Sequence, residues 1–169
     1  MFCAVTTHPT YDQLIALPAY VEQPVPMPFE DINGHLNVRH YIGIASEGLD
    51  ESLVEVGIPQ MWPLTHGQAC FTAEHHVTYL NELRTGDSMS ARVRLLGRSE
   101  RACHALVYVL DETHQRVACV VEEIFLHIEM DSRLTAPWPD DVAAAIDARV
   151  AEHRALPFDA DTNGSLALR

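Results

Sequence analysis

The chain has 169 residues, of which 47% are hydrophobic and 21% charged, so we expect a globular protein with a sizeable buried core. The formal net charge of −13, from 11 basic and 24 acidic residues, disfavours nonspecific nucleic-acid binding, which requires a basic surface. An anionic ligand would need a local basic patch on such a protein.

The residues Met1–Val5 carry no basic flank and no long apolar run, so we expect no signal peptide and no membrane span. Cys3, Cys70, Cys103 and Cys119 are widely spaced, without a Cys-x-x-Cys pair. This spacing is typical of free thiols in a reducing compartment, and we expect a cytoplasmic protein. The ten histidines include no His-x-x-x-His pair, so we expect neither a metal site nor a cofactor.

A short helix and a first strand are predicted near the N-terminus. Thr10 and Gln13 have the spacing of a capping box, and Pro18 ends the helix that they begin. Residues 20–26 predict a strand, with Val21 and Val25 on one face together with Gln23. Three prolines in and after this strand favour an edge position or a β-bulge.

A tight turn and a long helix follow. Gly34 permits a sharp turn, and Asn33 and Asn37 are candidate helix caps. Gly43 and Gly48 lie within the helix, where we expect them to let a sheet approach closely. The helix is predicted by apolar residues at intervals of three or four, namely Tyr41, Ala45, Leu49, Leu53 and Val56.

The second half of the chain predicts an antiparallel sheet. Strands are expected at 70–81, 88–96, 102–110 and 116–130, joined by short turns without helices between them. The last of these is almost continuously apolar, which predicts burial on both faces. Residues 58–68 predict a loop whose Met61, Trp62 and Pro63 we assign to packing, with an acyl pocket as the alternative.

The C-terminal part predicts a linker at residues 137–139 and a helix from Asp141 to about Ala155, capped by Asp140. We therefore expect a main domain over residues 1–136, with residues 137–169 forming a linker, helix and tail packed on the same domain. The predicted fold class is α+β, with one long helix against an antiparallel sheet.

Asp31, Asn33 and His35 crowd the turn before the long helix. A helix N-terminus carries free amides and about half a positive charge, so it can polarise a carbonyl group beside a carboxylate. The same residue types are common in ordinary turns and caps. The pattern alone leaves a catalytic and a purely structural role open.

The motif made by Asp31, Gly34, His35, Asn37 and Tyr41 resembles the signature of hotdog-fold acyl-CoA thioesterases of the 4-hydroxybenzoyl-CoA thioesterase type. In that family the acid at this first position is catalytic, and the sheet wraps around the helix. The Asp-x-Asn-x-His spacing is also similar to the active-site loop of acyl-carrier-protein thioesterases. One departure is Phe29, where many relatives have a second acid.

The resemblance extends over roughly residues 20 to 131. Residues 74–80, the Gly86-Asp87 turn and residues 95–97 are similar to the second block of the same thioesterases. Residues 127–157 resemble the C-terminal block of betainyl-CoA thioesterase-like proteins of carnitine breakdown. The resemblance also implies a homodimer or a dimer-based tetramer, with sites shared between protomers.

The resemblance implies that Asp31 is the base or nucleophile, with Asn33, His35 and Asn37 positioning it or the substrate carbonyl. On the strand over residues 70–81, Glu74 and His76 share one face and His75 and Val77 the other, and the sequence does not say which face is inward. We expect Glu74 as an auxiliary base and His75 as a substrate contact. Further expected substrate contacts are Gly34 and Tyr41, with Arg98 and Ser99 near the CoA phosphates.

The expected function is hydrolysis of an acyl-CoA thioester to the free acid and CoA, with no nucleic acid or membrane as partner. Two alternatives remain. One is a hotdog enoyl-CoA hydratase or dehydratase, whose motif has a proline after the asparagine and places its histidine one residue later. The other is a non-catalytic acyl-CoA-binding protein. The acyl group is left open.

Overall fold

The computed structural model describes residues 8–160 and 162–168. Its helical segments are α1 Tyr11–Leu14, the 3-10 turn η1 Met27–Phe29, α2 Val38–Val54, α3 Trp62–Thr65 and α4 Asp140–Arg154. Its strands are β1 Tyr20–Pro24, β2 Gln68–Tyr79, β3 Ser88–Arg98, β4 Ala102–Asp111, β5 Arg116–Glu129 and β6 Leu134–Thr135.

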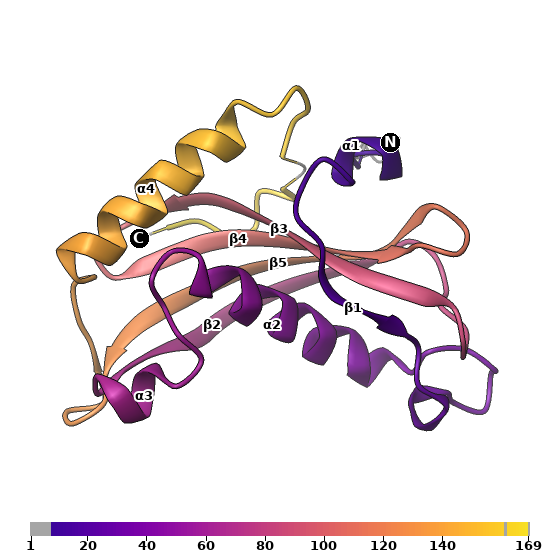
Figure 1. Ribbon diagram of the computed structural model, residues 1–169, viewed down its shortest axis with the longest axis horizontal. Coiled ribbons are helices and arrows are strands. Elements are labelled where there is room, and N and C mark those ends of the chain that lie inside the picture. The colour runs from indigo at the N-terminus through magenta and orange to yellow at the C-terminus, as the bar shows by residue number, and fades with distance from the viewer. Residues whose placement is uncertain (1–7, 161, 169) are drawn as a thin grey trace.

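The strands form one antiparallel sheet in the order β1-β3-β4-β5-β2, with the short β6 beside β5. The sheet curls around α2, the long helix below it in Figure 1. This confirms the predicted α+β class and the four main strands. The 58–68 segment contains the short α3, where the sequence predicted only a loop.

The helix α2 begins where the sequence predicted, because Asn37 is its cap and accepts a hydrogen bond from the Arg39 amide. The predicted apolar stripe is buried against the sheet. Gly48 lies so close to β3 that a Cβ atom there would be 2.5 Å from Ala91 Cβ. A Cβ atom at Gly43 would meet nothing within 4 Å. The expectation that Gly43 also lets the sheet approach the helix closely was therefore wrong.

Two other local predictions were wrong in detail. Val21 has a φ of 54°, and the register of β1 against β3 shifts between Tyr20 and Gln23. This irregularity buries Val21 and Val25 but leaves Gln23 exposed, although the predicted edge position and bulge are confirmed. The helix α4 begins at Asp140 itself, with Pro139 as its cap residue.

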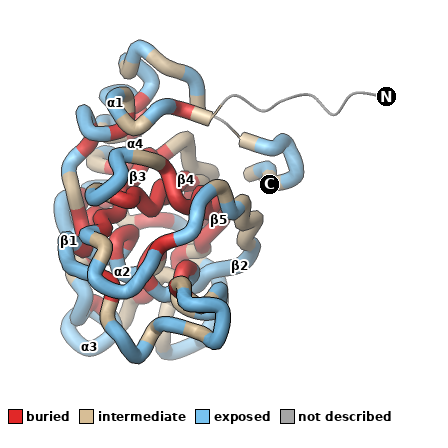
Figure 2. Tube along the Cα trace, turned by 90° about the vertical axis from the view of Figure 1, so that its right-hand side faces the viewer, coloured by how far each residue is buried: buried red, intermediate tan, exposed pale blue. Residues whose placement is uncertain are grey.

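The outer face of the sheet is also covered. A second hydrophobic cluster packs α1 and the C-terminal segment onto β4 and β5. Arg92 of β3 donates to the Leu17 carbonyl, and Arg94 donates to the Phe158 carbonyl. Most residues of β3, β4 and β5 are therefore buried (Figure 2). No helix in the described part of the chain is long and apolar enough to cross a membrane.

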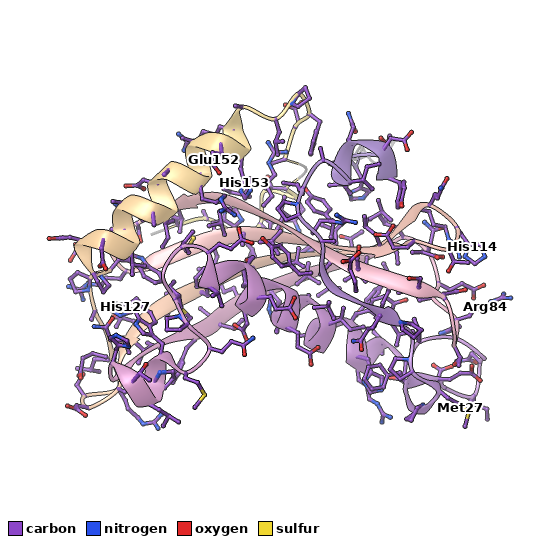
Figure 3. All side chains as sticks on the ribbon, in the orientation of Figure 1. Met27, Arg84, His114, His127, Glu152 and His153 are labelled. Carbon is purple, nitrogen blue, oxygen red and sulfur yellow. The ribbon has the colours of Figure 1, made fainter. Side chains whose placement is uncertain are left out.

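The helix α4 covers the part of β3 that β1 does not reach. β1 pairs with β3 only over Ser88–Ala91, and further along the strand the Leu95 amide donates to His153 Nδ1 at 2.8 Å. His153 lies on the side of α4 that faces the sheet (Figure 3). Arg98 makes a two-point ion pair with Asp147 of α4. The helix thus provides hydrogen-bond partners for part of the β3 edge that would otherwise be open.

The two glycines of α2 provide a matched test of this packing. Gly48→Ala should destabilise the protein by about 1–3 kcal/mol, because the new methyl group overpacks the contact with Ala91. Gly43→Ala should stabilise it by up to about 1 kcal/mol, since alanine is the better helix former in open space. Chemical denaturation of both variants measures the difference, and equal effects would contradict the close contact.

His153 predicts a pH dependence of stability. Burial, followed by the charge of Arg149, lowers its pKa from 6.5 to about 4. As the pH falls, the unfolded chain binds a proton at His153 from about pH 6.5, whereas the folded chain does so only from about pH 4. The contribution of neutral His153 to the free energy of unfolding is therefore lost between about pH 6.5 and pH 4. Between neutral pH and about pH 4.5 the Tm of His153→Gln should fall by less than that of the wild type. If the Tm of the wild type and of His153→Gln fell equally with pH, His153 would not be the source of the pH dependence.

Candidate active site

The turn before α2 holds the Asp31 carboxylate in place. The Asn33 amide donates to Asp31 Oδ1 at 2.7 Å, and the Gly34 amide donates to the Asp31 carbonyl at 3.0 Å. The Asp31 amide in turn donates to the His35 carbonyl at 3.0 Å. Gly34 has a φ of 79°, which explains why glycine is favoured at this position. The turn is therefore rigid around one carboxylate.

The helix N-terminus lies further along the chain than Gly34 and His35. α2 starts at Val38, so the amides of its first turn belong to residues after the Asn37 cap, and those of Arg39 and His40 donate to Asn37. The amide of Gly34, an expected substrate contact, is already used within the turn. His35 Nδ1 lies 3.2 Å from the Leu36 carbonyl oxygen and 3.9 Å from Asp31 Oδ1.

A cavity of about 460 Å³ opens beside this turn. It brings together the expected residues Asp31, His35 and Tyr41 with the end of β2. Among the described residues, no arginine or lysine lines it. Its lining residues are Asp31, His35, Leu36, Val38, Tyr41, Tyr79, Leu80, Asn81 and Glu82.

Two tyrosines form the apolar wall of the Asp31 cavity. The rings of Tyr41 and Tyr79 meet edge to face, with centroids 5.3 Å apart. Burial raises the pKa of Tyr41 to about 12 and also raises the pKa of Tyr79, so both hydroxyl groups stay protonated at neutral pH. The cavity thus offers the carboxylates of Asp31 and Glu82, the second of them paired with Arg84, together with an imidazole and two neutral aromatic rings.

Glu74 and His75 lie elsewhere on β2. His75 faces α2, where its Nε2 is 3.0 Å from Glu123 Oε2. Glu74 is exposed and points by strand alternation to the outer face, as does His76, which lines a small cavity beside Glu122. Glu74 is five residues from Tyr79, roughly 17 Å along an extended strand, so one chain does not bring it to Asp31.

Sequence reasoning did not single out Glu123, which is buried under α2. Thr72 donates to its Oε1 at 2.7 Å, and His75 pairs with its other oxygen. Its neighbour Glu122 is buried on the opposite face, 2.8 Å from His104 Nε2. The sequence signal that could have identified them is the presence of two adjacent acids inside the apolar run at 116–130. Tyr79 and Glu82 carried no such signal, because only the tertiary fold places them beside Asp31.

The expected contacts to CoA phosphates are engaged within the chain. The Arg98 guanidinium donates to both carboxylate oxygens of Asp147, at 2.8 and 2.6 Å. Ser99 Oγ accepts a hydrogen bond from the Ala102 amide and so closes the turn between β3 and β4. Binding a phosphate here would require Arg98 to leave α4.

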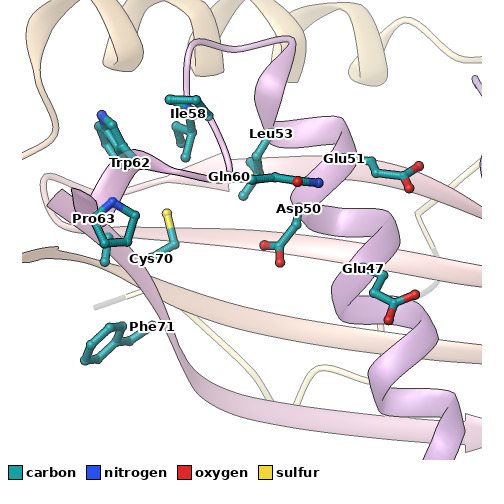
Figure 4. A pocket seen from close by; sticks show the side chains of 12 residues that line it. Glu47, Asp50, Glu51, Leu53, Ile58, Gln60, Trp62, Pro63, Cys70 and Phe71 are labelled. Atoms are coloured by element: carbon teal, nitrogen blue, oxygen red, sulfur yellow. The ribbon is translucent and has the colours of Figure 1, made fainter. Parts of the chain in front are cut away.

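A second cavity, of about 590 Å³, lies at the other end of α2 (Figure 4). Glu47, Asp50 and Glu51 of α2 line it together with Trp62 and Phe71. In Figure 4 the Asp50 side chain points toward Cys70, whereas those of Glu47 and Glu51 extend from the other side of the helix. Burial, followed by the charges of Glu123 and Glu47, raises the pKa of Asp50.

The three described cysteines do not provide a nucleophile. Burial raises the pKa of Cys70, which lines this second cavity, so its thiol stays protonated. Burial also raises the pKa values of Cys103 and Cys119 to about 12. All three are free thiols, as predicted, and Cys3 lies outside the described residues.

One group among the described residues has metal-ligand spacing, formed by Asp87, Asp111 and His114. Asp111 is fully buried, and its Oδ2 already pairs with His114 Nδ1 at 2.8 Å and with Arg116 Nε at 2.9 Å. The arginine supplies the positive charge that a metal ion would otherwise bring. This arrangement explains the cluster as an ion-pair network that closes the β4–β5 hairpin.

The Thioesterase-like superfamily matches residues 25–146, which include the Asp31 turn, α2 and the sheet from β2 to β5. The chain belongs to this superfamily. The betainyl-CoA thioesterase of Pseudomonas aeruginosa is 29% identical over 136 residues, which cover 80% of this chain and 86% of that protein.

Two solved structures share the fold. A Staphylococcus aureus protein solved in complex with CoA has a TM-score of 0.78 at 19% identity and covers 90% of this chain and 97% of its own. A putative thioesterase from Pseudomonas putida has a TM-score of 0.75 at 20% identity, with 90% and 96% covered. The hotdog fold is thereby confirmed, and the family match and the relative confirm the expected hydrolysis of an acyl-CoA thioester. The role of Asp31 remains a prediction.

Proposed function

We propose that this thioesterase hydrolyses its acyl-CoA substrate at the cavity beside α2, with Asp31 as the reacting carboxylate. The observation that carries the proposal is the position of this group. The turn presents its carboxylate to the cavity beside the first turn of α2, where among the described residues no arginine lines the cavity to neutralise it and His35 is the one imidazole beside it.

The reaction needs a polarised carbonyl group and an attacking oxygen. The Val38 amide, at the start of α2 and beside the cavity, is suited to hold the negative oxygen of the tetrahedral intermediate. The next two amides of the helix already donate to Asn37. Asp31 either accepts a proton from the attacking water or attacks the carbonyl carbon itself, and water then cleaves the resulting anhydride. In both routes the carbon–sulfur bond breaks, and the products are the free acid and CoA.

We propose betainyl-CoA as the first substrate to test. The support is the name of the Pseudomonas aeruginosa relative together with the cavity's composition. The betainyl group carries a quaternary ammonium, which is attracted by carboxylates and by aromatic ring faces. The Asp31 cavity offers Asp31 and the rings of Tyr41 and Tyr79, whereas the Glu82 carboxylate that also lines it is already paired with Arg84.

We further propose that the protein forms a cytoplasmic homodimer, alone or within a dimer-based tetramer. The 12-residue strand β2 ends the sheet, and no described segment pairs with its outer edge. Phe71 and Tyr79 are 40% and 47% exposed on this strand. An extended open edge with exposed aromatic residues favours pairing with a second copy.

Asp31→Asn tests the catalytic assignment. The amide can still accept the Asn33 hydrogen bond, so the fold and acyl-CoA binding should survive. Turnover should fall by about 10²–10⁴-fold, as is typical when a general base is lost. If Asp31 only stabilises the turn, the variant should lose about 1 kcal/mol of stability and keep near-normal turnover. Melting temperature, acyl-CoA affinity and hydrolysis rate separate these results.

Glu74→Gln is the matched control, because it removes an exposed carboxylate on the opposite face of β2. It should keep wild-type turnover. Loss of turnover in Glu74→Gln alone would move the base to the strand. A wild-type protein that binds acyl-CoA esters without turnover would contradict the proposal and favour a binding protein.

Light scattering tests the assembly. We expect twice the chain mass of 18.9 kDa, or four times that mass for a tetramer, at protein concentrations of about a micromolar. The physical reason is that β2 is an open edge that a second copy can pair with. A mass of one chain under these conditions would overturn both the dimer and any site that depends on it.

A further inference from the structure

The cavity at the second end of α2 has the composition of a site for a cation. Three carboxylates, those of Glu47, Asp50 and Glu51, share it with Trp62 and Phe71, and no arginine, lysine or histidine lines it (Figure 4). Leu53 and Ile58 complete an apolar wall. The cavity is partly open to solvent, since Glu47, Asp50, Glu51 and Phe71 are exposed residues. Carboxylates together with indole and phenyl rings around one cavity are suited to a quaternary ammonium.

The charges in this region are poorly compensated. Glu51 accepts a hydrogen bond from the Val21 amide, but within residues 8–160 and 162–168 neither Glu47 nor Asp50 has an ion-pair partner. The buried carboxylate of Glu123 lies close behind Asp50, and both line a smaller cavity that adjoins this one. A bound cation would relieve this repulsion.

We propose that this acidic cavity, lined by Glu47, Asp50 and Trp62, binds the cationic end of the acyl group for the Asp31 of the partner subunit. The proposal rests on the function proposed above and adds the residues that select the substrate. It differs from a cation site within one chain, because the reacting carbonyl and the selecting acids come from different protomers.

Within one chain, Asp31 and Asp50 are too far apart to contact the same acyl group. Asp31 lies beside the start of α2 at Val38, whereas Asp50 is more than three turns further, roughly 18 Å at about 1.5 Å per residue. In a betainyl thioester a single methylene separates the carbonyl carbon from the quaternary nitrogen, a distance of roughly 2.5 Å from standard bond lengths. One acyl group therefore cannot reach both residues of the same chain.

Pairing of two β2 edges removes this difficulty. Tyr79 lies at the Asp31 end of β2, while Cys70 and Phe71 line the acidic cavity at the other end. If two copies of β2 pair antiparallel about a centre near residue 75, Phe71 of the partner subunit lies opposite Tyr79. The acidic cavity of one protomer then opens beside the Asp31 cavity of the other.

The first experiment compares two substrates of equal shape. Betainyl-CoA carries a trimethylammonium group, and 3,3-dimethylbutyryl-CoA replaces that group with a neutral tert-butyl group. Asp50→Asn should lower kcat/KM for betainyl-CoA by about 10- to 100-fold and leave the neutral ester within about twofold of wild type. Asp159→Asn removes an exposed carboxylate in the C-terminal segment and should change neither value.

The second experiment uses hybrid dimers of Asp31→Asn and Asp50→Asn chains, purified through two different affinity tags. If each site combines Asp31 of one chain with Asp50 of the other, one site of the hybrid carries both substitutions and the other carries none. The hybrid should then recover about half of the wild-type turnover of betainyl-CoA, far above either parent dimer.

Each other outcome has a distinct meaning. Equal loss on both esters in Asp50→Asn would overturn the cation subsite while leaving the thioesterase function intact. A hybrid no more active than the mean of its parents would overturn the assignment to the partner's site. Absence of hydrolysis of either ester by the wild-type protein would instead count against the proposed function itself.

Discussion

The contact between α2 and β3 is the constraint on which the rest of the molecule depends. Gly48 brings the helix backbone against Ala91, so the sheet can curl around α2 rather than rest on its side chains. This contact places the two ends of the helix beside the two ends of β2. The Asp31 turn and Tyr79 meet at one end, and Asp50 and Cys70 meet at the other.

The two buried acids of β5 show how charge is accommodated between these layers. Glu123 faces α2 and pairs with His75, whereas Glu122 faces outward and pairs with His104. Burying a charge is costly unless it is paired and hydrogen-bonded, and both carboxylates have a histidine partner. Glu122 also accepts the Asn163 amide, so the same strand holds the C-terminal segment on the outer face.

The two edges of the sheet are treated differently. On one edge, β1 is short and irregular, and α4 covers the remainder of β3 through His153 and Arg98. On the other edge, β2 is long and no described segment pairs with its outer side. A fold that protects one edge with a helix and leaves the other open is suited to joining two sheets, which is also the arrangement that would complete the substrate site.

The sequence by itself determined the elements and the family motif. Apolar spacing at intervals of three or four marked α2, alternation and short turns marked the antiparallel strands, and Asn37 marked the start of the helix, because these signals arise from neighbours within a few residues. Asp31 and His35 could be selected as candidates for the same local reason.

Only the tertiary structure decided which side chains share a cavity. It placed Tyr79 beside Asp31, turned Glu74 to the outer face, paired Arg98 with Asp147 and gathered Glu47, Asp50 and Trp62 around one space. It also buried Arg92 and Arg94, which alternate with apolar residues along β3, under segments from both ends of the chain. These outcomes depend on contacts between residues far apart in the chain, and local periodicity contains no information about them.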